Sequence, residues 1–300
     1  MAEVVLAIFG PTASGKSAVA DALAERIPAE LVSADAMQAY RGLPLLTNQS
    51  EHPARLVGIW PLAHEASVGE YARLAHAAID EILAAGRTPV VAGGTGLYLR
   101  AALADLELPA PSADRVRWEA FYDERGGDAA HARLAELDPA AAALVHPNDR
   151  RRVVRALELA EAGASLVPDR ARLWTDETRH PTLIFGLEVP REELWRRIEQ
   201  RTHAMFERGV EAEVRAALAG AISSTARTIH GLRDIAELPR HEAVEALVLR
   251  TRRYAAYQRK WMRRIPGLIS VDAARPPADV ADEIVEVARA RQRLPARRAG

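Results

Sequence analysis

The sequence predicts an α/β fold with a parallel sheet core, helices on both faces of the sheet, and an all-helical insertion. Three observations carry this prediction. Apolar runs alternate with helical patterns through roughly the first hundred residues, as in parallel sheets with crossover helices. Glycine turns follow two of these apolar runs, at 10–15 and 93–96. From about residue 115 to 165 only helical periodicity occurs, and strand character returns at 182–189.

The elements before the insertion follow from apolar periodicity and glycine turns. We expect strands at 4–9, 30–35, 55–60 and 88–94, and helices at 17–27, at 67–86 and from residue 97. Right-handed crossovers then place both glycine turns at the carboxyl ends of neighbouring strands, where such sheets bind ligands.

The later elements follow from the same periodicity. We expect helix over 115–165 with a break at 146–149, a strand at 182–189, a long helix at 192–218, a late basic helix at 250–264 and a strand at 267–273. The predicted domains are an α/β core of residues 1–110 and 181–300 and a helical insertion of residues 111–180.

Composition limits the function classes. The chain has 300 residues, 49% apolar and 27% charged, with no cysteine, which is ordinary for a soluble globular protein. No apolar run approaches the ~18 residues of a membrane span, and the first residues carry Glu3 and no basic segment. Disulfides and cysteine-based zinc sites are excluded. We therefore expect a cytoplasmic protein without a membrane partner.

The net charge of −1 hides two basic segments. Residues 250–264 contain seven basic side chains and no acid, and residues 148–155 contain four basic side chains and one acid. Such segments can bind a polyanion, or they can be solvated helix faces. Charge alone does not separate the two interpretations.

The sequence GPTASGKS at 10–17, directly after the apolar run VVLAIF, matches the phosphate-loop pattern. Gly10 and Gly15 allow the backbone N–H groups to wrap a phosphate at a helix N-terminus. Lys16 adds a positive charge, and the Ser17 hydroxyl can hold Mg²⁺. The core is therefore predicted to be of the P-loop NTPase type and to bind a phosphate or pyrophosphate.

Two further residues are expected beside this phosphate. Asp35 follows the second predicted strand and could take a proton from an attacking group, or it could cap a helix over 36–40. Thr95, in the turn GGTG, could offer a hydroxyl to a bridging oxygen, or the turn could be only a turn. The strand PVVAGG ends in glycine where phosphate-loop ATPases normally place a magnesium-binding Asp. A pyrophosphate leaving group is therefore favoured over nucleotide hydrolysis.

The late segments leave alternatives open. Arg227 and Arg233 could each neutralise a pyrophosphate or face solvent. His230 has no partner at metal-ligand spacing and is interpreted as a packed or solvated side chain. Tyr254, Tyr257 and Trp261 have helical spacing, which favours a core-facing stripe over a base-stacking platform.

The ordered motifs resemble the bacterial tRNA dimethylallyltransferases, also called tRNA isopentenyltransferases. The resemblance covers most of the chain and rests on GPTASGKS (10–17), SADAMQAYRG (33–42), GGTGLYLRA (93–101), DPAAAALVHPNDRRRVVRALE (138–158), RTHAMFERGVEAEV (201–214) and TRRYAAYQRKWMRR (251–264). Each motif is weak to moderate alone, whereas the ordered set is highly specific.

The resemblance implies transfer of a dimethylallyl group from dimethylallyl diphosphate to N6 of adenine 37, in the anticodon stem-loop of tRNAs that read codons starting with U. It implies that Mg²⁺ assists, with Ser17 as the ligand. It implies Asp35 as the base for N6, with Thr95 and Lys16 as further catalytic residues. The predicted diphosphate-binding residues are Gly10, Thr12, Ala13, Ser14, Gly15, Lys16, Ser17 and Arg227. The predicted tRNA-binding residues are Asp35, Ala36, Met37, Gln38, Thr95, Arg117, Arg151, Arg152, Val153, Val154 and Arg155.

The chain departs from the family pattern in three places. LLTNQ at 45–49 and RLVG at 55–58 replace family motifs, and Gly231-Leu232 stands for Gly-Tyr, with the preceding arginine one position early. We favour Arg227 over Arg233 as the pyrophosphate ligand. The rival functions are a small-molecule kinase, an isopentenyltransferase for free adenine nucleotides and a nucleotide-switched RNA-binding module. We expect a monomer.

Overall fold

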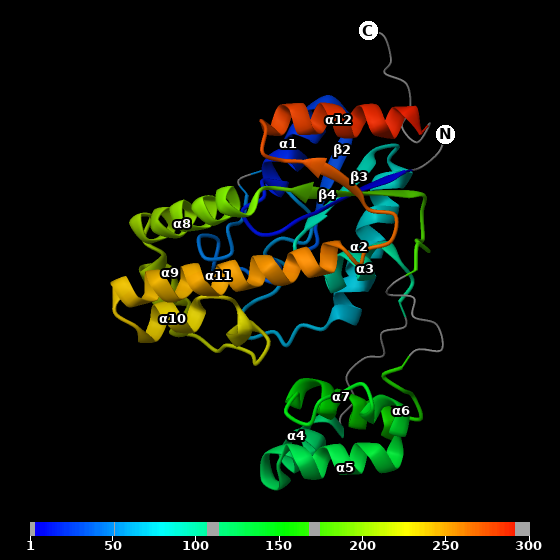
Figure 1. Ribbon diagram of the computed structural model, residues 1–300, viewed down its shortest axis with the longest axis vertical. Helices are drawn as coiled ribbons and strands as arrows, with labels where there is room; N and C mark the ends of the chain where they lie inside the picture. The colour runs from blue at the N-terminus through cyan, green and yellow to red at the C-terminus, as the bar shows by residue number, and fades with distance from the viewer. Residues whose placement is uncertain (1–3, 51, 107–113, 168–174, 292–300) are drawn as a thin grey trace. The chain divides into compact units, whose positions relative to one another are not determined.

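The computed structural model describes residues 4–50, 52–106, 114–167 and 175–291 of the chain (Figure 1). It divides into two compact units, one formed by Met1–Leu106 with Asp176–Gly300 and the other by Glu107–Thr175. These units correspond to the predicted core and insertion. The boundaries lie four and five residues before those expected from the sequence, at 107 instead of 111 and at 175 instead of 180.

The first unit is built on a five-stranded sheet in the order β2-β3-β1-β4-β5, with every pair parallel. The strands are β1 (Val5–Phe9), β2 (Ala29–Ser33), β3 (Thr88–Gly93), β4 (Thr182–Glu188) and β5 (Ile269–Asp272). All five residues of β1 are buried, because helices cover both faces of the sheet. A continuous apolar run such as VVLAIF is what a doubly covered parallel strand requires.

Helices cover the two faces in separate groups (Figure 1). The helices of this unit are α1 (Lys16–Arg26), α2 (Val68–Ala84), α3 (Gly96–Leu103), α8 (Arg191–Glu207), α9 (Val210–Leu218), the 3-10 helix η2 (Ala226–Thr228), α10 (Leu232–Glu237), α11 (Arg240–Met262) and α12 (Pro277–Ala290). One apolar cluster joins Leu6 and Phe185 of the sheet with Leu23 of α1 and Ile284 of α12. The pair α2 and α3 packs together on the opposite face.

In the described residues of the second unit, the regular secondary structure consists of helices alone. Its helices are α4 (Asp114–Arg125), α5 (Gly127–Leu137), α6 (Pro139–Ala142) and α7 (Arg150–Glu161). They enclose a small core of their own, which includes Trp118, Leu134, Val153 and Leu157. A separate core is the property that defines a compact unit.

Two sequence predictions fail at residues with positive φ. The strand expected at 55–60 forms only isolated bridges, Val32 with Arg55 and Tyr40 with Trp60. Leu56 (φ 67°) and Gly58 (φ 62°) turn the backbone away from the edge of β2. The helix expected at 192–218 divides into α8 and α9 because Gly209 (φ 89°) interrupts it.

No helix in the described ranges is long and apolar enough to cross a membrane.

Gly93, the last residue of β3, tests how closely the end of β3 approaches the backbone that follows β2. A Cβ at this position would lie 2.1 Å from the backbone oxygen of Ala34, and backbone cannot move aside cheaply. We expect Gly93→Ala to lower the free energy of unfolding by about 3 kcal/mol, the upper range for overpacking. The control is Gly220→Ala, where the nearest atom is 3.9 Å away. Equal urea midpoints for the two variants would contradict the packing described here.

Candidate functional site

The loop between β1 and α1 has the backbone of a phosphate cradle. Gly15 has a φ of 93° and Ala13 a φ of 64°, so the chain turns through left-handed conformations before α1 begins. A Cβ on Gly10 would lie 2.7 Å from Ser14 Oγ and 3.2 Å from Leu187 Cβ, which restricts the position to glycine. The loop N–H groups and the start of α1 together form a site for an anion.

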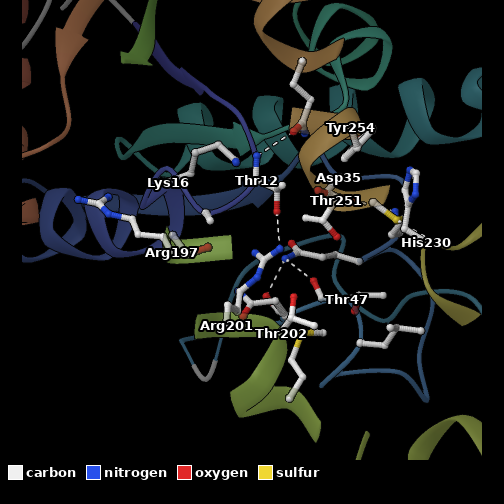
Figure 2. Close-up of a pocket in the computed structure, with 18 of the residues that line it drawn as sticks. Thr12, Lys16, Asp35, Thr47, Arg197, Arg201, Thr202, His230, Thr251 and Tyr254 are labelled. Atoms are coloured by element: carbon white, nitrogen blue, oxygen red, sulfur yellow. Dashed lines mark hydrogen bonds between the residues drawn. The ribbon is translucent and has the colours of Figure 1, made fainter. Parts of the chain in front are cut away.

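This loop opens onto a cavity of ≈ 430 Å³ (Figure 2). Five of the predicted diphosphate-binding residues line it: Thr12, Ala13, Gly15, Lys16 and Ser17. Gly10 and Ser14 are not lining residues. The Ser14 hydroxyl is buried and has no hydrogen-bond partner in the described structure, so the predicted contact of Ser14 with a diphosphate has no support from the cavity.

Lys16 is the cation of the loop. Its Nζ donates to the backbone oxygens of Gly10 at 2.9 Å and Pro11 at 2.8 Å. Desolvation lowers the pKa of Lys16 to about 8; the Asp35 carboxylate raises this pKa, and the Arg201 guanidinium lowers it. An anion bound at the loop would stabilise the charged ammonium and raise the pKa again.

Thr12 is hydrogen-bonded to side chains of two helices, α8 and α11 (Figure 2). Arg201 of α8 donates its Nη2 to Thr12 Oγ1 at 2.6 Å. Gln258 of α11 accepts a hydrogen bond from the Thr12 backbone N–H at 2.8 Å. The Thr12 N–H is therefore bonded within the protein and is not one of the N–H groups that face the cavity.

Arg197 and Arg201 both line the cavity, although neither was predicted from the sequence to have a role. Arg201 Nε is buried without a hydrogen-bond partner among the described residues, and desolvation lowers the pKa of Arg201 while Asp35 opposes the shift. Arg197 donates to Glu193 Oε1 at 2.7 Å. The four-residue spacing of these arginines, continued by Met205, marks one face of α8 and was the available signal.

Asp35 reaches the cavity from the carboxyl end of β2. Its Oδ1 accepts a hydrogen bond from the Met37 backbone N–H at 3.0 Å. Residues 36–39 form a turn and not a helix, so the alternative of a helix cap at Asp35 is wrong. The carboxylate stabilises this turn and shares the cavity with Lys16 and Arg201.

Thr95 precedes α3 and lies beside the Asp35 turn. Its Oγ1 accepts a hydrogen bond from the Ala36 backbone N–H at 3.3 Å and lies 3.5 Å from the Tyr254 hydroxyl. Thr95 is not itself a lining residue of the cavity. The structure therefore ties the second glycine turn to the segment that carries Asp35.

The wall opposite Lys16 is apolar and aromatic (Figure 2). His230 and Tyr254 have ring centroids 4.4 Å apart at an interplanar angle of 40°, and burial lowers the pKa of His230. Met37, Leu46 and Leu247 line the same cavity. The predicted core stripe is wrong for two of its three aromatics, because Tyr254 lines the cavity and Tyr257 is 53% exposed.

The structure does not bring Arg227 or Arg233 to the cavity. Arg227 is exposed on η2, and Arg233 is paired with Glu237 at 2.8 Å; neither lines the cavity. The chain leaves η2 after Thr228 and presents His230 inward before turning at Gly231 (φ 85°). The assignment of Arg227 as a diphosphate ligand is therefore corrected, and Arg201 is the arginine held against the loop.

The predicted tRNA-binding residues outside the helical unit lie near Asp35. Met37 and Gln38 line the cavity, and Ala36 donates to Thr95 as described above. The Gln38 side chain is bonded to Ser33 Oγ at 3.0 Å and to the Asn48 backbone oxygen at 3.0 Å. This turn thus has a defined shape at the edge of the cavity.

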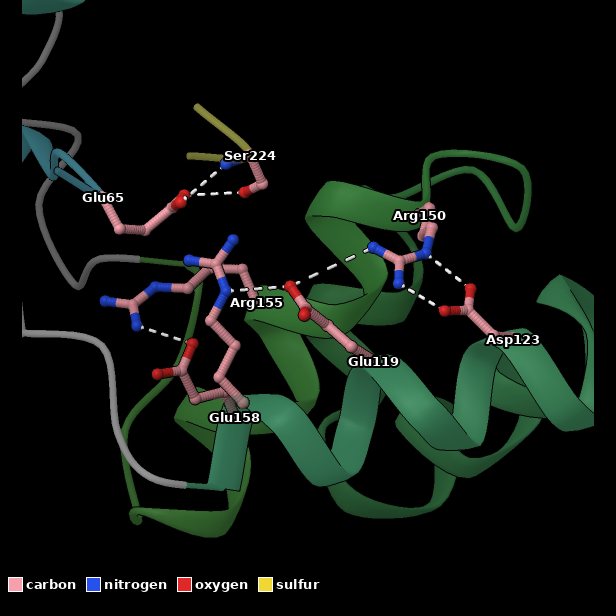
Figure 3. A network of polar contacts seen from close by, with 8 residues as sticks. Glu65, Glu119, Asp123, Arg150, Arg155, Glu158 and Ser224 are labelled. Atoms are coloured by element: carbon pink, nitrogen blue, oxygen red, sulfur yellow. Dashed lines mark hydrogen bonds and ion pairs between the residues drawn. The ribbon is translucent and has the colours of Figure 1, made fainter. Parts of the chain in front are cut away.

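Within the helical unit, acids pair with most of the predicted RNA-binding arginines. Arg155 pairs with Glu158 at 2.8 Å (Figure 3). Arg117 bonds to Glu161, and Arg152 approaches Asp149 at 3.5 Å. Arg151 is exposed and makes no ion pair with a described residue.

Val153 and Val154 are 0% and 2% exposed in the core of the helical unit. Both were predicted to bind tRNA, but α7 turns their side chains into this core, so these side chains are not available to contact RNA.

The cavity offers few protein ligands for a metal ion. The described residues contain no group of three or more His, Cys, Asp or Glu side chains able to bind a metal. Ser17 and Asp35 line the cavity together. Mg²⁺ commonly combines one or two protein oxygens with substrate phosphates and waters, so this donor set fits an ion that arrives with a diphosphate.

Lys16 predicts a pH dependence of diphosphate binding. Above the free-state pKa of about 8, binding must restore a proton to Lys16, so affinity is fully present below pH 8 and lost as the pH rises. We expect the Kd of dimethylallyl diphosphate to rise by up to about tenfold per pH unit above 8. Lys16→Arg should flatten the profile, because guanidinium stays charged. Calorimetry from pH 7 to 9.5 measures both, and a flat wild-type profile would contradict the prediction.

The two arginine assignments can be compared directly. We expect Arg201→Ala to raise the Kd of dimethylallyl diphosphate about tenfold to a hundredfold, as for a lost charge-assisted hydrogen bond. Arg227→Ala is the matched control and should change the Kd less than twofold, because its side chain is exposed. A larger defect in Arg227→Ala would restore the assignment made from the sequence.

Comparison with known proteins shows relatives along almost the whole chain. The tRNA dimethylallyltransferase of Thermobifida fusca is 42% identical over 281 residues, which cover 87% of this chain and 88% of that protein. The tRNA dimethylallyltransferase of Corynebacterium jeikeium is 37% identical over 298 residues, covering 94% and 96%.

Solved structures have the same fold. The tRNA isopentenylpyrophosphate transferase of Bacillus halodurans aligns with a TM-score of 0.68 at 31% identity, over 97% of this chain and 96% of that one. A eukaryotic dimethylallyltransferase acting on tRNA aligns with a TM-score of 0.80 over 99% of this chain and 82% of that chain. At 22% identity, this last likeness concerns the fold alone.

Two family models match the chain, one described as Isopentenyl transferase over residues 3–55 and one described as IPP transferase over residues 38–265. Since the second model spans more than half of the sequence and the relatives match over nearly their full length, the chain belongs to the IPP transferase family.

Proposed function

We propose that this chain transfers a dimethylallyl group from dimethylallyl diphosphate to N6 of adenine 37 in tRNAs that read codons starting with U. The observation that carries the proposal is the juxtaposition of opposite charges in one cavity. Lys16 and Arg201 lie at the loop, and the Asp35 carboxylate reaches the same cavity. The first two suit a diphosphate, and the third suits a nucleophile that must lose a proton.

The donor half of the reaction uses the loop. The allylic C1–O bond breaks and its electron pair leaves with the diphosphate. The loop N–H groups, the Lys16 ammonium and the Arg201 guanidinium meet the negative charge that grows on the leaving oxygens. Mg²⁺, held by the diphosphate oxygens and Ser17, would supply further charge stabilisation. These groups act most strongly where water is displaced from the cavity.

The acceptor half uses Asp35. The N6 lone pair of adenine forms the new bond to C1, and the proton lost from N6 passes to the Asp35 carboxylate. Adenine has to leave its stack to enter the cavity. The ring pair of His230 and Tyr254 offers a face on which a base could pack, since tilted or offset aromatic contacts are favourable.

The rival functions have less support. Phosphate-loop ATPases normally end a later strand with a magnesium-binding Asp, but β3 ends at Gly93 and is followed by Gly94. An enzyme for free adenine nucleotides needs no separate helical unit with a basic helix such as α7. The proposal keeps the expected monomer and cytoplasmic location.

One experiment tests the function. The protein is incubated with dimethylallyl diphosphate, Mg²⁺ and unmodified tRNA, and the nucleosides are analysed by mass. The expected product is isopentenyladenosine at position 37, with release of one diphosphate. Transfer to free AMP with no transfer to tRNA would favour the free-nucleotide enzyme, and ATP turnover without RNA would favour the kinase.

Asp35→Asn tests the base. The amide keeps the shape and can still accept a hydrogen bond from the Met37 N–H, but it cannot take the proton. We expect the single-turnover rate to fall by about 10²–10⁴-fold, the usual contribution of a general base, while the Kd of the donor changes little. A loss of less than tenfold would reduce Asp35 to a stabiliser of its turn.

Arg151 tests the basic helix α7. We expect Arg151→Ala to reduce the slope of log affinity against log salt for tRNA by about 0.7–0.9, one phosphate contact. The matched control on the same helix is Arg150→Ala. Arg150 is already bound to Asp123 by two hydrogen bonds of 2.7 and 2.6 Å, so its loss should change the slope less. Equal slopes for wild type and Arg151→Ala would remove Arg151 from the RNA surface.

A further inference from the structure

We infer that Gln258 is a positioning residue that fixes the distance between the diphosphate loop and the segment that carries the base. Gln258 lies in the C-terminal part of α11, four residues before the helix ends at Met262, and is 2% exposed. A fully buried amide in a helix interior requires hydrogen-bond partners for both of its ends. The inference rests on the proposed reaction, and it concerns how the two halves of the site are kept in register.

The amide of Gln258 joins the two glycine turns. Its Oε1 accepts from the backbone N–H of Thr12 at 2.8 Å, and its Nε2 donates to the backbone oxygen of Gly94 at 2.8 Å. A Cβ on Gly94 would lie 2.3 Å from Gln258 Nε2. The absence of a side chain at Gly94 is therefore what admits the amide between the two turns.

The same face of α11 also lies near the segment that carries Asp35. Tyr254, four residues earlier on α11, has its hydroxyl 3.5 Å from Thr95 Oγ1. Thr95 Oγ1 in turn accepts from the backbone N–H of Ala36, the residue after Asp35. One helix thus contacts the diphosphate loop through Gln258, and through Tyr254 it contacts Thr95, which is bonded to the segment that carries Asp35.

This link matters because the sheet holds the strands but not the loops beyond them. The pairing of β1 with β3 ends at Phe9 and Gly93, where the two turns begin. Glycine-rich turns have many accessible conformations of their own. Beyond the sheet, the Gln258 amide links the two turns by one hydrogen bond to each turn, and the size of the amide sets the distance between them.

The Gln258 hydrogen bonds should matter more for the rate of transfer than for the binding of either substrate. Each substrate binds mainly to its own loop, the diphosphate to 10–17 and the adenine beside Asp35. Transfer needs C1 and N6 in line, and a misplacement of about 1 Å can cost about a hundredfold in rate. Loss of the Gln258 bridge should therefore lower the rate of the bound complex and leave the affinity for each substrate nearly unchanged.

The first experiment replaces both polar ends. We expect Gln258→Met to lower the single-turnover rate at saturating donor and tRNA by about 10–100-fold, with each Kd within threefold of wild type. The matched control is Gln200→Met, an exposed glutamine on α8, which should retain the wild-type rate. A Gln258→Met rate within threefold of wild type, or a defect confined to donor affinity, would overturn the inference.

The second experiment uses a conservative variant that pH can rescue. A protonated carboxyl in Gln258→Glu can accept from Thr12 and donate to Gly94, whereas the carboxylate would oppose the Gly94 oxygen. The ratio of variant to wild-type rate should therefore rise as the pH falls, by at least fivefold between pH 8.5 and 6. The charged and titratable side chains of the same cavity are present in both enzymes, so the ratio removes their common contribution; they are Lys16, Asp35, Arg197, Arg201, His230 and Tyr254. Gln200→Glu should give a flat ratio, and a flat ratio for Gln258→Glu would overturn the inference.

A third measurement does not depend on activity. Amide hydrogen exchange of the 10–17 peptide should be faster in Gln258→Met than in wild type, because the Thr12 N–H loses its acceptor. Unchanged exchange would refute the bridge. If wild type makes no prenylated tRNA, the proposed function fails, while the exchange result still decides whether Gln258 holds the loop.

Discussion

The desolvated ammonium of Lys16 at the start of α1 is the constraint on which the rest of the site depends. With its pKa lowered to about 8, Lys16 is mostly protonated at neutral pH, and a buried ammonium needs hydrogen-bond acceptors. Two backbone oxygens from the loop itself supply these acceptors. The loop must then keep its shape. Arg201 of α8 and Gln258 of α11 stabilise it through hydrogen bonds to Thr12.

The charges around the cavity follow from this arrangement. Arg197 shares the Glu193 carboxylate with Arg196, and Lys16 and Arg201 face Asp35, so the cavity has an excess of at least one positive charge. A diphosphate that enters reverses this sign, and Mg²⁺ bound with it would restore the balance. Interactions between these groups are strong because the walls on the far side are His230, Tyr254 and apolar side chains, which exclude water and lower the local dielectric.

The helical unit has a different electrostatic character. Arg150 and Arg155 of α7 are paired with acids (Figure 3), so a count of basic residues in α7 overstates the charge that is free to meet RNA. Exposed ion pairs stabilise the unit only slightly, but they fix which guanidinium groups remain free. Arg151 is therefore a more informative position than its neighbours.

The sequence by itself determined the elements that depend on local pattern. The strand–loop–helix of residues 5–26, the parallel sheet, the helical unit and the approach of Asp35 to the loop follow from periodicity and glycine spacing. Resemblance to the family then identified the chemistry. Local pattern misplaced the segment at 55–60, because the positive φ of Leu56 is a property of the folded chain.

Only the tertiary structure decided which late side chains reach the cavity. Arg201, Gln258 and His230 lie far along the chain from Thr12, and helical spacing leaves the direction of a side chain open until α8 and α11 are packed. The chain leaves η2 after Thr228, so Arg227 lies on the surface whereas His230 lines the cavity. Val153 and Val154 were likewise assigned to RNA by position and are buried by packing. The physical reason is that a one-residue shift on a helix rotates a side chain by about 100°, so contacts between distant elements are set by packing and not by order along the sequence.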